Sequence, residues 1–239
     1  MEDPIRNVLV TGASGFVGAA ICSGLHTSGF AVRGAIRSLH SSHLASNIEP
    51  VAVCNLDAAT DWSWALAGVD CVIHCAARAH VMHETEADAL AAYRSVNVDG
   101  SWHLAEQAAA AGVRRLVYLS SIGVLGIYTN GRGPFFVSDA PKPVEDYAVS
   151  KWEAEQALWA VAANTGLEVV VVRPPLVYGP GAKGNLARLR TRSTISRHNP
   201  ASLRSHQAVA DFAVIDELPN DYLLIEFPRV GRERPVLGM

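Results

Sequence analysis

The sequence lacks several features that mark specialised classes of protein. It has no run of about twenty apolar residues, and its N-terminus shows no basic segment followed by an apolar one. Its four cysteines form no CxxC pair, and its net charge of −3 provides no excess of positive charge. These absences argue against a membrane span, a secretory signal, a cysteine-based metal site and a binder of nucleic acid. We therefore expect a cytoplasmic protein with no membrane or nucleic-acid partner.

Short apolar runs alternate with longer amphipathic segments over the first 185 or so residues. Runs at 8–10, 30–36, 51–53, 69–76, 114–119 and 168–172 predict strands. Segments at 16–28, 88–111 and 147–164 predict helices, each with a glycine just beyond its end. This alternation predicts an α/β fold: a Rossmann-type, doubly wound parallel sheet with helices on both faces.

The pattern changes after about residue 185. Residues 189–205 are basic and polar without a clear apolar period, whereas 222–227 could form a late strand. The last residues are rich in arginine and proline and resemble a loose tail. We divide the chain into a domain of residues 1–186 and an atypical C-terminal segment of residues 187–239.

A glycine-rich turn, TGASGFVG, joins the first strand to the first helix at residues 11–18. Gly12 permits a tight turn, Gly15 lets the backbone approach a pyrophosphate, and Gly18 lets helix and strand pack closely. The N–H groups at the helix start then hold the anion. The turn predicts a dinucleotide site. The residues expected to form it are Gly12, Ser14, Gly15, Phe16, Val17 and Gly18.

The end of the second strand bears on which dinucleotide binds. An acidic residue there would accept from the ribose 2′-hydroxyl, but the sequence has Arg37 and Ser38, with Arg33 upstream. A guanidinium suits a 2′-phosphate, so we expect NADP(H) to be preferred, with NAD(H) possible. The alternative is that Arg37 is a solvated charge. Asp57, after the third strand, could accept from the adenine amino group or cap a helix.

Tyr147 and Lys151 stand four residues apart at the start of a predicted helix, so they share one face. A free phenol has a pKa of about 10, too high for a base at neutral pH. A nearby ammonium and the positive nicotinamide ring favour the phenolate. Lowering the pKa by about three units needs roughly 4 kcal/mol. Tyr147 can then exchange a proton with a substrate hydroxyl while hydride moves at the nicotinamide.

Two further polar positions complete the predicted site. Ser120 and Ser121 end the strand at 114–119, at the carboxyl edge where such sheets bind ligands. One of these hydroxyls can hold the reacting oxygen against Tyr147. Asn97 lies inside a long helix, where it binds backbone or a water in the proton path, or belongs to a buried polar network.

As a set, the motifs resemble the extended short-chain dehydrogenase/reductase family from residue 5 to about 186. They are TGASGFVG at 11–18, HCAA at 74–77, SVNVDG at 95–100, LSSIGVLG at 119–126, YAVSK at 147–151 and RPPLVYGPG at 173–181. The resemblance implies that Ser121, Tyr147 and Lys151 form a catalytic triad, with Asn97 beside them. The further cofactor residues that it implies are Leu56, Asp57, Ala76, Ala77, Tyr147, Lys151 and Pro174.

Within that family, segments 76–82 and 179–185 are similar to those of nucleotide-sugar 4-epimerases and 4-ketoreductases of surface-polysaccharide synthesis. This likeness implies hydride transfer at C4 of a UDP-linked sugar. It also implies Arg78, His80, Ser121 and Asn185 as substrate residues. Family members often dimerise through helices like those at 88–111 and 147–164, so a homodimer is expected. No metal is expected, because His80 and His83 lack further ligands.

The sequence departs from the family pattern in two places. Residues 32–38, VRGAIRS, look closer to NADPH-using reductases of the dihydroflavonol type. The alternative activity is therefore NADPH-dependent reduction of another small ketone or aldehyde. The family pattern also stops near residue 189, so the C-terminal substrate region is expected to be truncated or atypical. A catalytically impaired cofactor-binding remnant is the third alternative.

Overall fold

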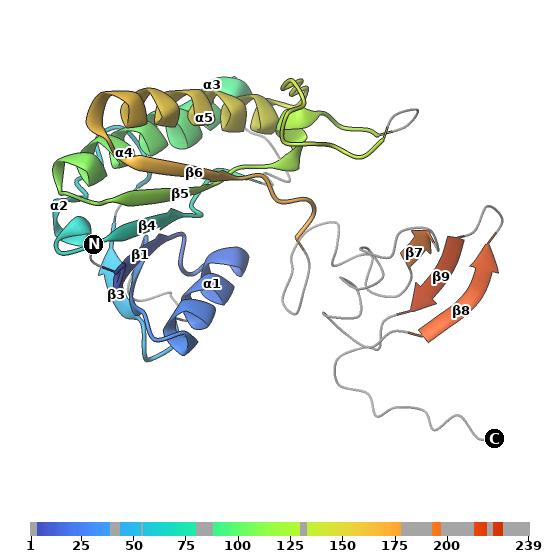
Figure 1. Ribbon diagram of the computed structural model, residues 1–239, viewed down its shortest axis with the longest axis horizontal. Helices are drawn as coiled ribbons and strands as arrows, with labels where there is room; N and C mark the ends of the chain where they lie inside the picture. The colour runs from blue at the N-terminus through green and yellow to red at the C-terminus, as the bar shows by residue number, and fades with distance from the viewer. Residues whose placement is uncertain are drawn as a thin grey trace. The chain divides into compact units, whose positions relative to one another are not determined.

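The computed structural model describes residues 4–38, 44–53, 55–79, 88–129, 133–177, 193–196, 213–218 and 222–226 (Figure 1). The chain forms two compact units, Met1–Leu176 and Val177–Met239. The first unit contains all the described residues of the predicted site. The second contributes three short strands.

Six parallel strands form the sheet of the first unit. They are β1 (Asn7–Thr11), β2 (Ala31–Ile36), β3 (Glu49–Ala52), β4 (Cys71–His74), β5 (Arg115–Leu119) and β6 (Glu168–Val172). Their order is β3-β2-β1-β4-β5-β6. The order reverses between β1 and β4, which creates the crevice where doubly wound sheets bind ligands. The predicted Rossmann-type sheet is confirmed.

Helices lie on both faces of this sheet (Figure 1). They are α1 (Phe16–Thr27), α2 (Ser63–Leu66), α3 (Ala89–Arg94), α4 (Gly100–Ala110) and α5 (Asp146–Thr165). Leu104 of α4 and Leu158 of α5 pack with Leu116 and Tyr118 of β5 in one core. Cys22 of α1 packs in a second core on the other face. Two apolar layers therefore hold the sheet, as the continuous apolar runs of the strands predict.

The long helix expected at 88–111 is divided in the structure. A π-helical turn, η2 (Ser95–Asp99), separates α3 from α4. Such a turn inserts one extra residue, and it often occurs at functional sites. Here the turn contains Asn97, which is buried. Apolar periodicity did not reveal the change, because it does not distinguish an α-helical turn from a π-helical one.

The described parts of the second unit form a three-stranded antiparallel sheet. Its strands are β7 (Ser193–Ser196), β8 (Ala213–Leu218) and β9 (Tyr222–Glu226), in the order β7-β9-β8. The late strand expected at 222–227 is confirmed as β9. β7 lies within the segment 189–205, which has no clear apolar period, and a four-residue strand is too short to produce one.

Candidate active site

The glycine turn is packed too tightly to accept side chains at two of its glycines. Gly12 has φ +65°, and a Cβ on it would meet the backbone nitrogen of Ala76 at 2.9 Å. A Cβ on Gly18 would lie 2.2 Å from the carbonyl oxygen of Gly12. Both contacts are shorter than real Cβ contacts, so these positions require glycine. The turn is thereby held against the segment that follows β4.

The N-terminus of α1 is open for an anion. Its N-cap, Gly15, offers no side-chain hydrogen bond to the first turn, and that turn holds no acidic residue. Ser14 and Gly15 are exposed, while Phe16 and Val17 begin the helix. Free N–H groups and the positive end of a twelve-residue helix together suit a pyrophosphate. The residues present therefore fit the predicted dinucleotide.

A buried histidine connects the turn to α4. His74, at the end of β4, has one ring nitrogen 2.6 Å from the Thr11 hydroxyl and the other 2.9 Å from the Ser101 hydroxyl. The Thr11 oxygen also accepts from the backbone N–H of Ala76 at 3.1 Å. Burial and the nearby Lys151 lower the pKa of His74 to about 3, so its ring is neutral. The histidine thus orders the glycine turn and the segment after β4 without carrying charge.

Asn97 fixes the segment expected to line the substrate pocket. Its side-chain oxygen accepts from the Arg78 backbone N–H at 2.8 Å, and its amide nitrogen donates to the Arg78 carbonyl at 3.1 Å. The same nitrogen donates to Ser150 on α5 at 3.0 Å, and Ser150 donates to the Tyr147 carbonyl at 2.8 Å. Of the roles considered for Asn97, binding backbone within a buried network is the one observed.

Ser121 caps a short 3₁₀ helix, η3 (Ile122–Leu125), directly after β5. Its hydroxyl accepts from the Gly123 N–H at 3.1 Å. A Cβ on Gly123 would lie 3.3 Å from that hydroxyl and 3.4 Å from the Cβ of Ala148. Ser121 and the first turn of α5 therefore approach Gly123 from two sides. Gly123 thus lies between Ser121 and Ala148, the residue that follows Tyr147.

Lys151, four residues after Tyr147 on α5, is almost completely buried. Its Nζ lies 4.1 Å from the centre of the Tyr118 ring. Burial lowers its pKa to about 7, although Cys75 and Glu155 act in the opposite direction. The ammonium is therefore close to its titration midpoint at neutral pH.

Tyr147 is partly buried, and its ring packs edge-on against Tyr93 with the centroids 6.1 Å apart. Burial, with a smaller contribution from Tyr93, raises its pKa. The prediction that the Lys151 ammonium and the nicotinamide ring together favour the phenolate stays a prediction. Desolvation opposes the phenolate, so positive charge near the phenol must offset it for Tyr147 to act as a base.

A buried carboxylate on α5 binds polar residues that follow β5 and β6. Ser120, next to Ser121, donates to the buried carboxylate of Glu155 at 2.5 Å. Arg173, directly after β6, donates to both oxygens of that carboxylate, at 3.0 and 2.6 Å. Sequence reasoning missed Glu155. The available signal was its spacing, four residues beyond Lys151 and eight beyond Tyr147 on the same helical face.

The two arginines considered for cofactor selection, Arg33 and Arg37, differ in their surroundings. Arg37 is exposed, immediately after the last residue of β2. Arg33 lies within the strand, where it bonds to the carbonyls of Ala65 and Ala67 at 2.8 and 3.0 Å and pairs with Glu49 at 3.3 Å. Arg33 is therefore not available to the cofactor, and only Arg37 remains a candidate.

The remaining predicted residues are placed as follows. Asp57 caps a turn, since its carboxylate accepts from the Ala59 N–H at 2.9 Å. Leu56 packs against Gly100, at the start of α4. Pro174 accepts from the Ile122 N–H at 3.0 Å, which ties the end of β6 to η3. Two substrate candidates, His80 and Asn185, lie outside the described residues.

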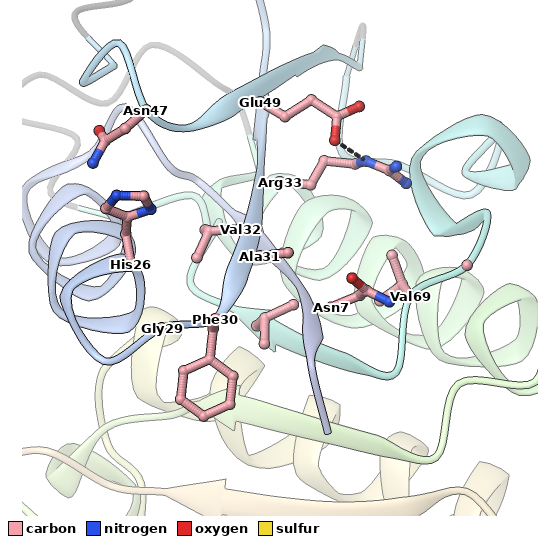
Figure 2. A pocket seen from close by; sticks show the side chains of 12 residues that line it. Asn7, His26, Gly29, Phe30, Ala31, Val32, Arg33, Asn47, Glu49 and Val69 are labelled. Carbon is pink, nitrogen blue, oxygen red and sulfur yellow. Dashed lines mark ion pairs between the residues drawn. The ribbon is translucent and has the colours of Figure 1, made fainter. Parts of the chain in front are cut away.

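A hollow of about 680 Å³ lies at the opposite, amino-terminal edge of the sheet (Figure 2). Asn7, Ala31 and Glu49, at the starts of β1, β2 and β3, line it together with His26 and Val69. Of the described residues considered for the cofactor or substrate, only Arg33 contributes to it. It is therefore separate from the glycine turn and from Tyr147.

The described part of the chain has neither a membrane-spanning helix nor a cluster of metal ligands. No helix there is long and apolar enough to cross a membrane. Within the same residues, no three His, Cys, Asp or Glu side chains come together as a metal site.

The fold and the glycine turn at the carboxyl edge of the sheet define a nicotinamide-dinucleotide-binding domain of the short-chain dehydrogenase/reductase type. A sequence model of the NAD dependent epimerase/dehydratase family matches residues 8–218. The chain belongs to that family. The resemblance stated from the motifs is confirmed.

Three similar proteins illustrate the relationship. UDP-glucose 4-epimerase of Vibrio cholerae is 42% identical over 185 residues, which span 77% of this chain and 56% of that protein. The structure of MoeE5 in complex with UDP-glucose and NAD is 30% identical, with a TM-score of 0.63, covering 77% of this chain and 60% of that one. UDP-glucose 4-epimerase of Thermotoga maritima with UDP-glucose is 26% identical, with a TM-score of 0.64, covering 77% and 62%. The chain thus spans little more than half the length of the curated relative.

Proposed function

We propose that this chain is an NAD(P)-dependent oxidoreductase or epimerase that transfers hydride at C4 of a UDP-linked sugar, as a 4-epimerase or 4-ketoreductase. The observation that carries the proposal is that Ser121 follows the carboxyl end of β5, at the sheet edge that also holds the glycine turn after β1, while the first two turns of α5 carry Tyr147 and Lys151. The similarity to UDP-glucose 4-epimerases supports the sugar class.

Each residue has a distinct role in this mechanism. Tyr147 exchanges the proton of the C4 hydroxyl, and Ser121 holds the same oxygen. Lys151 places positive charge beneath the phenol and hydrogen-bonds the nicotinamide ribose. Asn97 keeps the segment around Arg78 in position. When bound, the nicotinamide supplies the hydride acceptor or donor and, in its oxidised form, positive charge.

The proposed binding residues form two groups. For the substrate they are Arg78, His80, Ser121 and Asn185. For the cofactor they are Gly12, Ser14, Gly15, Phe16, Val17, Gly18, Arg37, Leu56, Asp57, Ala76, Ala77, Tyr147, Lys151 and Pro174. NADP(H) is the preferred cofactor in this proposal, because Arg37 stands exposed at the end of β2 where an acid would select NAD(H).

The exposed Arg37 also favours the second candidate function, NADPH-dependent reduction of another small ketone or aldehyde with the same triad. A third candidate is a cofactor-binding remnant without a complete substrate pocket. The three differ in what they turn over: a UDP-sugar, a simple carbonyl compound, or neither.

The proposal also covers the C-terminal region, the oligomeric state and the cellular location of the protein. Residues 187–239 act as a remnant or replacement of a substrate domain. A homodimer forms through α4 and α5, supported by the exposed Trp102 and Trp159 on those helices. The protein works in the cytoplasm, without nucleic-acid or membrane partners.

The first test is titration of the chain with NADPH and NADH, followed by nicotinamide fluorescence and then by assay of UDP-glucose and UDP-galactose interconversion. Tyr147→Phe is expected to abolish turnover and to change cofactor affinity less than about twofold, because it removes only the hydroxyl. Lys151→Ala is expected to weaken both, since it removes a cofactor contact as well. Wild-type turnover in Tyr147→Phe would disprove the triad. Binding of neither nucleotide would favour the remnant.

A further inference from the structure

A buried carboxylate outside the triad lies on the same face of the catalytic helix. Tyr147, Lys151 and Glu155 follow one another at intervals of four residues on α5, and Glu155 has no solvent-exposed surface. Both of its oxygens are occupied, one by Ser120 and the Nε of Arg173, the other by Nη2 of Arg173. An ion pair buried this deeply costs desolvation energy, so its retention points to a specific role.

The partners of Glu155 reach the two strand ends that border the site. Ser120 directly precedes Ser121, and its backbone N–H donates to the Val172 carbonyl at 2.8 Å. Arg173 directly follows β6, and α5 runs over β5 and β6 (Figure 1). One carboxylate therefore connects the helix that carries Tyr147 and Lys151 to the strand end that carries Ser121.

Glu155 also brings a negative charge into the surroundings of Lys151. The titratable groups that interact with the lysine are His74 at the end of β4, Cys75 just after it, Tyr118 on β5 and Glu155 on α5. Among these described groups, Glu155 is the only carboxylate. The others are neutral at pH 7, because burial raises the pKa values of Cys75 and Tyr118 and lowers that of His74.

We propose that Glu155 is a positioning residue for the reaction: its carboxylate fixes α5 against the ends of β5 and β6 and keeps Lys151 charged beside Tyr147. The role in the reaction rests on the proposed function. The effect on Lys151 does not, because it concerns the chain alone. Burial lowers the pKa of Lys151 to about 7, and the negative charge of Glu155 limits that fall.

The test is an NMR titration of Lys151. The chain has only three lysines, Lys142, Lys151 and Lys183, so ¹³Cε-lysine labelling gives a spectrum that Lys→Arg variants at the other two positions can assign. Glu155→Gln keeps the shape of the side chain and removes its charge. We expect the Lys151 midpoint to fall by about one pH unit, and by clearly less in Glu155→Asp, which retains the charge.

The matched control is Glu153→Gln on the same helix. Glu153 also binds an arginine through both oxygens, at 2.6 and 2.8 Å to Arg94, but at the surface. Its loss should leave the Lys151 midpoint unchanged. If Glu155→Gln does not fold because Arg173 is left unpaired, the neutral pair Glu155→Gln/Arg173→Met replaces it, and the midpoint should again fall.

A Lys151 midpoint within about 0.3 pH unit of wild type in folded Glu155→Gln, or in the folded double variant, would overturn the proposal. So would a fall of the same size in Glu153→Gln. In the sugar assay, Glu155→Gln should lower kcat at pH 7.5 about tenfold with KM changed less than about twofold. If Lys151 responds as expected while the wild-type chain turns over no UDP-sugar, the arrangement around Lys151 stands and the proposed reaction fails.

Discussion

At the scale of single residues, the site combines groups that are useful for chemistry with groups that are costly to bury. Lys151 illustrates the conflict, because its side chain is buried in a core that lowers its pKa from 10.5 to about 7. Catalytic positions often destabilise the fold that holds them. The cost should therefore appear when the lysine is replaced by an apolar residue of similar length.

We predict that Lys151→Met abolishes turnover and stabilises the fold at pH 7 by roughly 1–3 kcal/mol. Between pH 7 and 10.5 the unfolded chain binds more protons at this lysine than the folded chain, so wild-type stability rises with pH in that window. Below about pH 7 both states are protonated and the lysine adds no slope. Urea unfolding at pH 7 and 9.5 measures the difference, which should shrink at the higher pH. A variant less stable than wild type at pH 7 would contradict this account.

Arg37 carries the prediction on cofactor choice. Arg37→Glu should weaken NADPH binding about 10- to 100-fold and leave NADH binding within about threefold, because only NADPH has a 2′-phosphate for the guanidinium to bind. Fluorescence titration measures both constants.

Arg33→Gln is the matched control for this experiment. Its side chain is occupied by the Ala65 and Ala67 carbonyls, so the ratio of the two affinities should not change. An unchanged ratio in Arg37→Glu as well would mean that Arg37 is a solvated strand-end charge.

At the scale of elements, close backbone approach shapes the cofactor edge. The first strand, turn and helix fit together only because Gly18 lies against the Gly12 carbonyl. The π-helical turn η2 has a comparable role between α3 and α4, where Asn97 binds Arg78 and Ser150. Both features fix the backbone rather than supply reactive groups.

Two glycines of α1 should respond in opposite ways to the same substitution. Gly18→Ala puts a Cβ 2.2 Å from the Gly12 oxygen and should cost about 2–4 kcal/mol together with dinucleotide affinity. Gly24→Ala meets nothing within 4 Å and should stabilise the exposed helix by about 0.5–1 kcal/mol. Denaturant unfolding of both variants measures the contrast. Equal effects would show that the turn relaxes to accept a side chain.

At the scale of the whole molecule, α4 and α5 present large apolar side chains to solvent. Trp102 is 43% exposed and Trp159 is 41% exposed, and Trp159 packs edge-on against Trp152 with the centroids 5.9 Å apart. Aromatic residues of this kind are enriched at protein interfaces. They support the proposed homodimer through these two helices.

If that dimer forms, Trp159→Glu should convert it to a monomer, since a buried unpaired charge at an interface is strongly unfavourable. Sedimentation equilibrium measures the mass. Trp64→Glu serves as the control, because Trp64 is 80% exposed and lies on α2, which is not one of the two proposed interface helices. A wild-type monomer, or a dimer that survives Trp159→Glu, would contradict this interface.

Much of the first unit could be predicted because its signals are local. The runs at 8–10 and 114–119 predict strands, which are β1 and β5, and the YAVSK spacing places Tyr147 and Lys151 on one face. The run at 168–172 predicts a buried strand, which is wrong in its burial: β6 lies at the edge of the described sheet and none of its residues is buried. The short α2 and η3 could not be predicted in this way, because four residues are too few for a period. The π-helical turn escaped for another reason: its cause is a set of bonds from Asn97 to distant residues.

The sequence by itself determined the strand–helix alternation, the glycine turn and the chemical types available at the site, because each depends on neighbours along the chain. Only the tertiary structure decided which of these groups meet. It removed Arg33 from the cofactor by pairing it with Glu49, joined Asn97 to Arg78, and enclosed Glu155 with Ser120 and Arg173. It also set the pKa values of His74, Tyr147 and Lys151, since desolvation depends on what packs around a group in space.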